Sequence, residues 1–240
     1  MNIKKVSEDG WPSGTGLFET IRVEDGKVFA LHRHHCRVQE NADRLGVVIP
    51  KEAEVAQASY QEISKFSFRL GRLRWHFDLA GDFTLSYAEF EDPLLPARLT
   101  IHDERSDDYT VRKKQYPYRN LDWLAKAKAN GFDDAIILTK DGQISETTVA
   151  TLLLKIKGEW VTPPLSSGIL NGVVRALVLE AGLAKVRRVE EAELEKIDSA
   201  LLLTSLRNSQ IVGEIAGRKL SIDTQKNVQI HELMQRYKGM

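Results

Sequence analysis

The chain has 240 residues, of which 42% are hydrophobic and 28% charged, an ordinary composition for a globular protein with one large core or two smaller ones. Its 34 Lys and Arg residues balance 34 Asp and Glu residues, which argues against a general attraction to nucleic acid or to an anionic membrane. The single cysteine, Cys36, excludes an internal disulfide and a cysteine-only metal site.

Hydropathy predicts a protein that does not enter a membrane. The N-terminal residues lack the apolar stretch of a signal peptide. No later apolar run approaches the roughly 20 residues that a membrane helix needs. A single cysteine suits a reducing compartment, so the prediction is a cytoplasmic protein.

The first third of the chain predicts antiparallel strands combined with helices, an α+β pattern. Residues 16–31 contain two β-prone runs on either side of Asp25-Gly26, a strong hairpin-turn signal. Apolar residues then recur at helical spacing until Gly46, which predicts a short amphipathic helix. The elements expected after the hairpin are helices over 34–45 and 51–65 and strands over 72–77 and 83–90.

A domain boundary is expected near residues 91–98, EDPLLPAR, because two prolines and a charged stretch interrupt the pattern. This predicts a smaller N-terminal α+β domain over 1–105 and a larger C-terminal domain over 106–240. The elements expected in the second domain are helices over 120–130, 172–181, 190–196 and 228–237 and strands over 135–139, 148–156 and 200–204.

The first of four informative segments is GLFETIRVEDGKVFALHRHHCR, residues 16–37. It resembles the class IV aminotransferases, which have the two-domain fold type IV architecture of D-amino-acid aminotransferase-like enzymes and use pyridoxal 5'-phosphate. The resemblance implies that Arg37 binds the cofactor phosphate, and a guanidinium fork can donate two parallel hydrogen bonds to such a group. The alternative is a solvated arginine on a helix surface.

The second segment, KANGFDDAIILTKDGQISETTVAT at residues 128–151, is similar to the part of the family that carries a glutamate for the pyridine nitrogen. The resemblance assigns this role to Glu146. A carboxylate there keeps the nitrogen protonated, so that the ring can accept electrons. The alternative is a surface glutamate at a strand end. Thr151 departs from the asparagine that the family usually has.

The third and fourth segments predict the rest of the phosphate site. TPPLSSGILNGVVRALVLE, residues 162–180, resembles the family throughout, and a helix that opens at Gly172 can aim the N–H groups of Val173 and Val174 at an anion. LLLTSLRNSQIVGEI, residues 201–215, resembles the family's strand and turn, where a hydroxyl completes the phosphate site. Ser205 is the expected residue, and Thr204 is the alternate.

The lysine that binds the cofactor covalently is harder to place. Counting back from Gly131 in register with the family gives Lys113 as the catalytic residue, but RKKQYPYRN departs from the usual residues and Lys114 is adjacent. Neighbours on a strand point to opposite faces, so only one of the two lysines can reach the cofactor.

The resemblance implies an enzyme that acts on a small-molecule amine and works as a homodimer. It is strongest to the lyase branch, which releases pyruvate from aminodeoxychorismate and forms 4-aminobenzoate for folate synthesis. A branched-chain or D-amino-acid aminotransferase is the alternative, and a non-catalytic binding module is a remote one. Leu79-Ala80 stands near the place of a family Arg-Gly, so another arginine is expected to bind substrate carboxylates. The candidates are Arg22, Arg72, Arg74, Arg119 and Arg207.

The histidines His32, His34 and His35 form a compact group in the sequence. A zinc site is not expected, because no carboxylate or cysteine at metal-ligand spacing completes the group and the side chains diverge at the start of a helix. The histidines are therefore predicted to be structural or surface residues.

Overall fold

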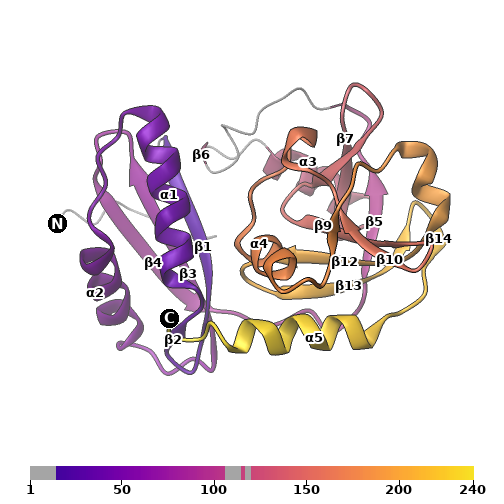
Figure 1. The fold of residues 1–240 in the computed structure, drawn as a ribbon. Coiled ribbons are helices and arrows are strands. Elements are labelled where there is room, and N and C mark those ends of the chain that lie inside the picture. The colour runs from indigo at the N-terminus through magenta and orange to yellow at the C-terminus, as the bar shows by residue number, and fades with distance from the viewer. Residues whose placement is uncertain (1–14, 106–114, 117–119) are drawn as a thin grey trace. The chain divides into compact units, whose positions relative to one another are not determined.

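The computed structural model describes residues 15–105, 115–116 and 120–240, and the chain divides into two compact units (Figure 1). Unit 1 comprises Met1–Asp92, Val111–Tyr118 and Gln235–Met240, and unit 2 comprises Pro93–Thr110 and Arg119–Met234. Both units combine sheets with helices, which confirms the expected α+β class. No helix in the described ranges is long and apolar enough to span a membrane.

Unit 1 is built on an antiparallel sheet with strand order β2-β1-β3-β4. Asp25 and Gly26 both have positive φ values, 50° and 74°, as a tight hairpin turn between β1 and β2 requires. The predicted hairpin is therefore confirmed. The strands are β1 (Gly16–Glu24), β2 (Lys27–Val28), β3 (Leu70–Asp78) and β4 (Phe83–Glu89), and β6 (Gln115–Tyr116) pairs with β1.

The two faces of this sheet differ in chemistry because side chains alternate along each strand. One face carries apolar residues such as Ile21, Leu73 and Trp75, and helices α1 (Leu31–Leu45) and α2 (Glu52–Ile63) cover it (Figure 1). Trp75 Nε1 donates to Ser59 Oγ of α2 at 2.9 Å. The opposite face carries polar side chains in register, with Thr20 opposite Arg74.

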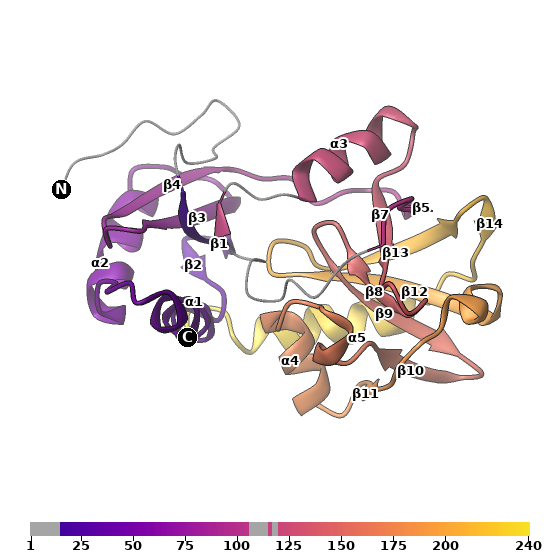
Figure 2. The ribbon, with the colours of Figure 1, turned by 90° about the horizontal axis from the view of Figure 1, so that it is seen from above.

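Unit 2 contains a larger, curled sheet with order β11-β10-β9-β12-β13-β5-β7-β8, whose buried aliphatic side chains form a second core. In Figure 2 helix α3 (Asn120–Ala129) lies beside β7, while α4 (Val173–Glu180) packs against β12. Helix α5 (Thr224–Gln235) ends the unit. The strands are β5 (Ala97–Ile101), β7 (Asp134–Leu138), β8 (Ile144–Thr147), β9 (Thr151–Ile156), β10 (Glu159–Thr162), β11 (Lys185–Val186), β12 (Ile197–Thr204), β13 (Asn208–Ile215) and β14 (Arg218–Lys219).

The chain passes from unit 1 to unit 2 after Asp92, and β5 pairs in parallel with β13 and β7 of unit 2. Two elements differ from the expectations. The strand expected over 148–156 begins only at Thr151, as β9, and a separate strand, β8, precedes it, because Thr147 N–H donates to the Ala150 carbonyl and turns the chain between them. The helix expected over 190–196 is the 3₁₀-helix Glu191–Lys196.

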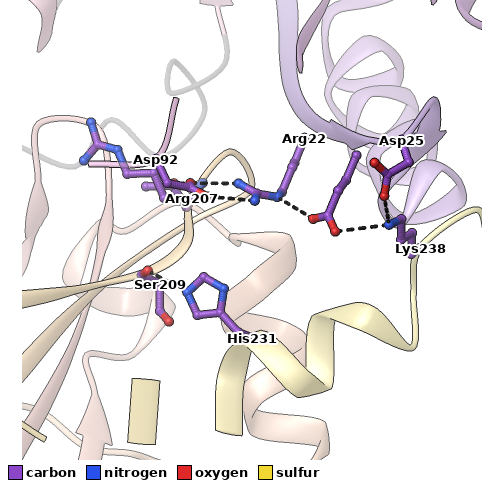
Figure 3. Close-up of polar contacts among 9 residues, drawn as sticks. Arg22, Asp25, Asp92, Arg207, Ser209, His231 and Lys238 are labelled. Carbon is purple, nitrogen blue, oxygen red and sulfur yellow. Dashed lines mark hydrogen bonds and ion pairs between the residues drawn. The ribbon is translucent and has the colours of Figure 1, made fainter. Parts of the chain in front are cut away.

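A charge network in unit 1 fastens two distant chain segments to β1 (Figure 3). Arg22 donates two parallel hydrogen bonds of 2.8 Å to the Asp92 carboxylate and lies 3.4 Å from Glu24. Lys238 contacts Glu24 at 3.1 Å and Asp25 at 2.8 Å. Asp92 is the last residue before the chain enters unit 2, and Lys238 follows its return. The network therefore ties the first and the last of the chain's crossings between the units to β1.

Candidate active site

Glu146 lies in β8 at an irregularity of the sheet. Ile136 pairs with Thr147 and Leu138 with Ile144, so β8 contains one extra residue between the two pairs. Such a β-bulge re-aims the side chains next to it. The Glu146 side chain is 3% exposed, and its Oε2 accepts a hydrogen bond of 2.9 Å from the N–H of Leu170. Glu146 is therefore a buried, oriented carboxylate and not a surface residue.

A second buried carboxylate, that of Asp134, binds the turn at Thr147 and Thr148, the two residues that follow Glu146. Asp134 accepts hydrogen bonds from the backbone N–H groups of Ala135 (2.8 Å) and Thr148 (2.9 Å). It also accepts them from the hydroxyls of Thr147 (2.7 Å) and Thr148. Burial raises the pKa of the Asp134 carboxyl, and the four hydrogen bonds act in the opposite direction. Sequence reasoning missed the structural role of this residue, although the acidic pair Asp133-Asp134 is visible in the sequence at the start of β7.

The start of α4 adjoins Glu146 through a short loop. Leu170, whose N–H binds Glu146, accepts a hydrogen bond of 2.8 Å from Gly172 N–H through its carbonyl. The first bond of the helix runs from Ala176 N–H to the Gly172 carbonyl, so the N–H groups of Val173 and Val174 have no acceptor within the helix. A Cβ atom at Gly172 would lie 3.3 Å from Thr151 Oγ1, a close approach that favours glycine.

The turn that carries Ser205 belongs to the same end of the sheet. Leu203 of β12 pairs with Thr151 of β9, and the Thr151 hydroxyl lies beside Gly172. Thr204, the alternate residue, uses its hydroxyl to accept the N–H of Arg207 at 3.0 Å. Ser205 is half-buried in the turn that follows. Strand pairing and loop contacts thus connect the Ser205 turn, the α4 start and Glu146 within unit 2.

Arg37 belongs to unit 1, where it is buried together with Glu19. Its Nε donates to Glu19 Oε1 at 2.9 Å, and its Nη2 donates to Oε2 of the same carboxylate. His34 Nδ1 lies 2.8 Å from Glu19 Oε2. The exposed fractions are 8% for Arg37, 0% for Glu19 and 1% for His34. This burial excludes the solvated-arginine alternative. Sequence reasoning missed Glu19, whose signal was a carboxylate inside the apolar run GLFETI.

The three neighbouring histidines contact three different groups. His32 lies 2.7 Å from Glu52, His34 binds Glu19, and His35 Nε2 lies 3.1 Å from the Pro50 carbonyl. Within the described ranges, no group of three or more His, Cys, Asp or Glu side chains could hold a metal ion. The expected lysine, Lys113, and its neighbour Lys114 lie outside the described residues, as does Arg119.

The donor set of unit 2 fits a phosphorylated pyridine. A helix N-terminus with unbonded N–H groups suits a phosphate dianion. A buried carboxylate suits a protonated ring nitrogen, because the ion pair stabilises the charged form. Glu146 and the start of α4 offer these two groups and are linked through Leu170.

Comparisons with known proteins support the family that the four sequence segments resemble. A model of the family "Amino-transferase class IV" matches residues 16–215. A protein of Schizosaccharomyces pombe described as "Putative aminodeoxychorismate lyase" is 26% identical over 176 residues, covering 70% of this chain and 74% of its own length. A "Probable branched-chain-amino-acid aminotransferase" of Rickettsia conorii is 26% identical over 204 residues, covering 76% and 70%.

The fold has a close match among solved structures. A crystal structure from Legionella pneumophila, described as "Putative 4-amino-4-deoxychorismate lyase", superposes with a TM-score of 0.82 at 21% identity, covering 92% of this chain and 90% of that one. This match confirms the fold. Because the family model spans most of the sequence, the chain belongs to the class IV aminotransferases, a family of enzymes that depend on pyridoxal 5'-phosphate.

Proposed function

We propose that the chain is a 4-amino-4-deoxychorismate lyase that releases pyruvate and forms 4-aminobenzoate, a folate precursor. The observation that carries the cofactor part is the connection from Glu146 through Leu170 to Gly172, which supplies a ring-nitrogen partner and a phosphate site from one continuous structure. The lyase part is supported by the segments GLFETIRV and LLLTSLRN and by the lyase descriptions of the S. pombe and L. pneumophila proteins.

Pyridoxal 5'-phosphate supplies an electron sink for cleavage of a bond next to the substrate amine. Glu146 holds a proton on the ring nitrogen. The N–H groups of Val173 and Val174 and the Ser205 hydroxyl bind the phosphate, and Arg37 contributes a charge-assisted contact. Lys113, or Lys114 in the alternative register, moves the proton between the substrate and its leaving group.

The structure sorts the arginines proposed for substrate carboxylates. Arg22 is neutralised by Asp92 and Glu24, and Arg207 Nη1 donates to Gln210 Oε1 at 2.8 Å. Arg72 and Arg74 lie on the polar face of the unit 1 sheet, where Arg74 Nε is 3.4 Å from Thr20 Oγ1. Arg72, Arg74, Arg119 and Arg207 therefore stay the candidates for binding the substrate carboxylates.

The test is the reaction without a keto acid. Purified protein loaded with pyridoxal 5'-phosphate should convert aminodeoxychorismate to equal amounts of pyruvate and 4-aminobenzoate, because elimination leaves the cofactor ready for the next cycle. Pyruvate is measured with a coupled dehydrogenase and 4-aminobenzoate by chromatography. A protein that takes up no cofactor would contradict the whole proposal.

A branched-chain aminotransferase is the second candidate, because the R. conorii relative carries that description at the same identity. A transaminase needs a keto acid to restore its cofactor and shows ping-pong kinetics. Conversion of leucine or a D-amino acid that depends on 2-oxoglutarate, without pyruvate release from aminodeoxychorismate, would replace the lyase by this alternative. The proposal also includes a homodimer in the cytoplasm, which light scattering and cell fractionation can test.

A further inference from the structure

Asp134 has no role in the proposed chemistry, yet its buried carboxylate accepts four hydrogen bonds. It is 1% exposed, and its four donors are neutral groups. Three of these hydrogen bonds come from Thr147 and Thr148, the two residues that follow Glu146 directly. The hydrogen bonds of Asp134 therefore hold the backbone segment that directly follows Glu146.

The β-bulge gives this attachment a function. With regular alternation, Glu146 would point to the same face as Ile144, which belongs to the apolar core of unit 2. The extra residue in β8 changes the direction of the side chains at this point. A bulge leaves ladder groups unpaired, so its geometry must be held by other contacts. Asp134 holds the far side of the bulge, and Leu170 N–H holds the Glu146 carboxylate itself.

We propose that Asp134 is a positioning residue: it locks the turn at Thr147 and Thr148 so that the bulge aims Glu146 at the nitrogen of a bound pyridine ring. This inference rests on the proposed role of Glu146. It adds that the orientation of Glu146 depends on a carboxylate that does not touch the cofactor. Thr147 also contacts Ala150 N and O at 3.0 Å, which extends the locked turn to the start of β9.

The hydrogen bonds predict how substitutions rank. Oδ1 accepts three of the four bonds and Oδ2 accepts only the Thr147 hydroxyl. Asp134→Asn can keep the three bonds at Oδ1, because the Thr147 hydroxyl can turn to the Ala150 carbonyl and accept from the new amide. Asp134→Ala removes all four acceptor contacts. Thr148→Val removes one hydroxyl donor and leaves its backbone N–H in place.

The experiment is a double-mutant cycle between Asp134→Ala and Glu146→Gln on the cofactor-loaded protein. We expect Asp134→Ala to lower kcat at least about tenfold with little change in KM, and to shift the pH midpoint of the cofactor's visible absorbance band. In the Glu146→Gln background the same change should lower kcat less than about twofold, because the residue acts through Glu146. Asp134→Asn should restore kcat to within about threefold of wild type.

Leu154→Ala is the stability-matched control, since Leu154 is fully buried in the unit 2 core away from this turn. It should lower the Tm without changing the cofactor's absorbance band. Any effect of Leu154→Ala on kcat should be additive with that of Glu146→Gln. If Asp134→Ala fails to fold, Thr148→Val enters the same cycle. Additive effects of Asp134→Ala and Glu146→Gln, or an unshifted band, would overturn the inference while leaving the proposed function intact. If Glu146→Gln alone has no effect, the proposed role of Glu146 fails, and with it this inference.

Discussion

Glu19 of unit 1 and Asp134 of unit 2 are both carboxylates removed from water, but the two units compensate them differently. Glu19 meets a guanidinium and an imidazole, from Arg37 and His34. Asp134 meets two hydroxyls and two backbone N–H groups and no charged group among these four partners. The partners of Glu19 can carry positive charge, whereas the four partners of Asp134 are neutral dipoles.

The difference shows what each carboxylate can do. The two hydrogen bonds to Glu19 fix the direction of the Arg37 guanidinium. The four neutral donors of Asp134 fix the backbone without adding a cation, which suits a place where a third carboxylate, Glu146, is proposed to attract a positive ring nitrogen. Substitutions at these positions should therefore separate effects on chemistry, stability and cofactor affinity.

The largest effect is expected at Glu146, the proposed partner of the pyridine nitrogen. Glu146→Gln keeps the shape but cannot keep a pyridine nitrogen protonated, so turnover should fall on the order of a hundredfold or more while the cofactor still binds. Turnover and cofactor absorbance are measured on the same sample. Glu159→Gln, at an exposed ion pair with Lys185, is the control and should retain activity. A wild-type rate in Glu146→Gln would mean that this carboxylate does not face the ring.

Removing the charge of Glu19 should cost the most stability. Glu19→Gln leaves the Arg37 guanidinium buried without its anion, and breaking a buried pair in this way costs roughly 3–5 kcal/mol. Chemical denaturation measures the free energy of unfolding. Glu40 is an exposed residue of α1, the helix that carries Arg37, and Glu40→Gln should change the free energy of unfolding little. If Glu19→Gln lowers the free energy of unfolding by less than about 1 kcal/mol, the ion pair with Glu19 is not what stabilises the buried Arg37 guanidinium.

Arg37 itself should affect cofactor affinity more modestly. Arg37→Lys keeps a positive charge near Glu19 but loses the planar fork, so the phosphate contact should weaken by about 1.5–3 kcal/mol, a tenfold to somewhat over a hundredfold loss of affinity. Titration of the apo-protein with pyridoxal 5'-phosphate gives the dissociation constant. Unchanged affinity together with lower stability would make Arg37 a partner of Glu19 alone.

The smallest effect is expected at the exposed end of the unit 1 charge network. The hydrogen bond from Lys238 lowers the pKa of Asp25 below its ordinary value of 3.8. A lowered carboxyl pKa stabilises the folded state above the ordinary value, and this contribution disappears as the pH falls through the lowered pKa. Asp25→Asn should therefore lower the Tm by at most about 3 °C at pH 6 and by less at pH 3. A difference that grows on acidification contradicts the assignment.

Local sequence signals predicted most of the elements, and the failures have physical causes. The Asp25-Gly26 turn and the glycine after α1 are local signals, and both appear where expected. Strand β5 was missed because its neighbours β13 and β7 are distant in sequence, and pairing of this kind leaves little local trace. The break between β8 and β9 was missed because hydroxyl groups, not a glycine or proline, make the turn at Thr147.

The candidate site was predictable where one sequence segment contains both the proposed phosphate-binding groups and the helix that holds them. Val173 and Val174 need only the helix that follows Gly172, and the structure has that helix. Glu19 and Asp134 were not predictable, because their partners come from separate elements and only folding brings them together. The proposed ligand roles of the following residues stay predictions: Arg37, Lys113, Glu146, Val173, Val174 and Ser205.

The contacts of Lys238 also constrain how the molecule can be synthesised. Lys238 and Glu24 lie 214 positions apart, and Gly239 N–H donates to the Val28 carbonyl on edge strand β2. A nascent chain on the ribosome makes β1 and β2 early but cannot supply these contacts until residues 235–240 have emerged. During translation unit 1 therefore carries an uncovered strand edge until these residues emerge, the period in which such an edge can pair with another chain.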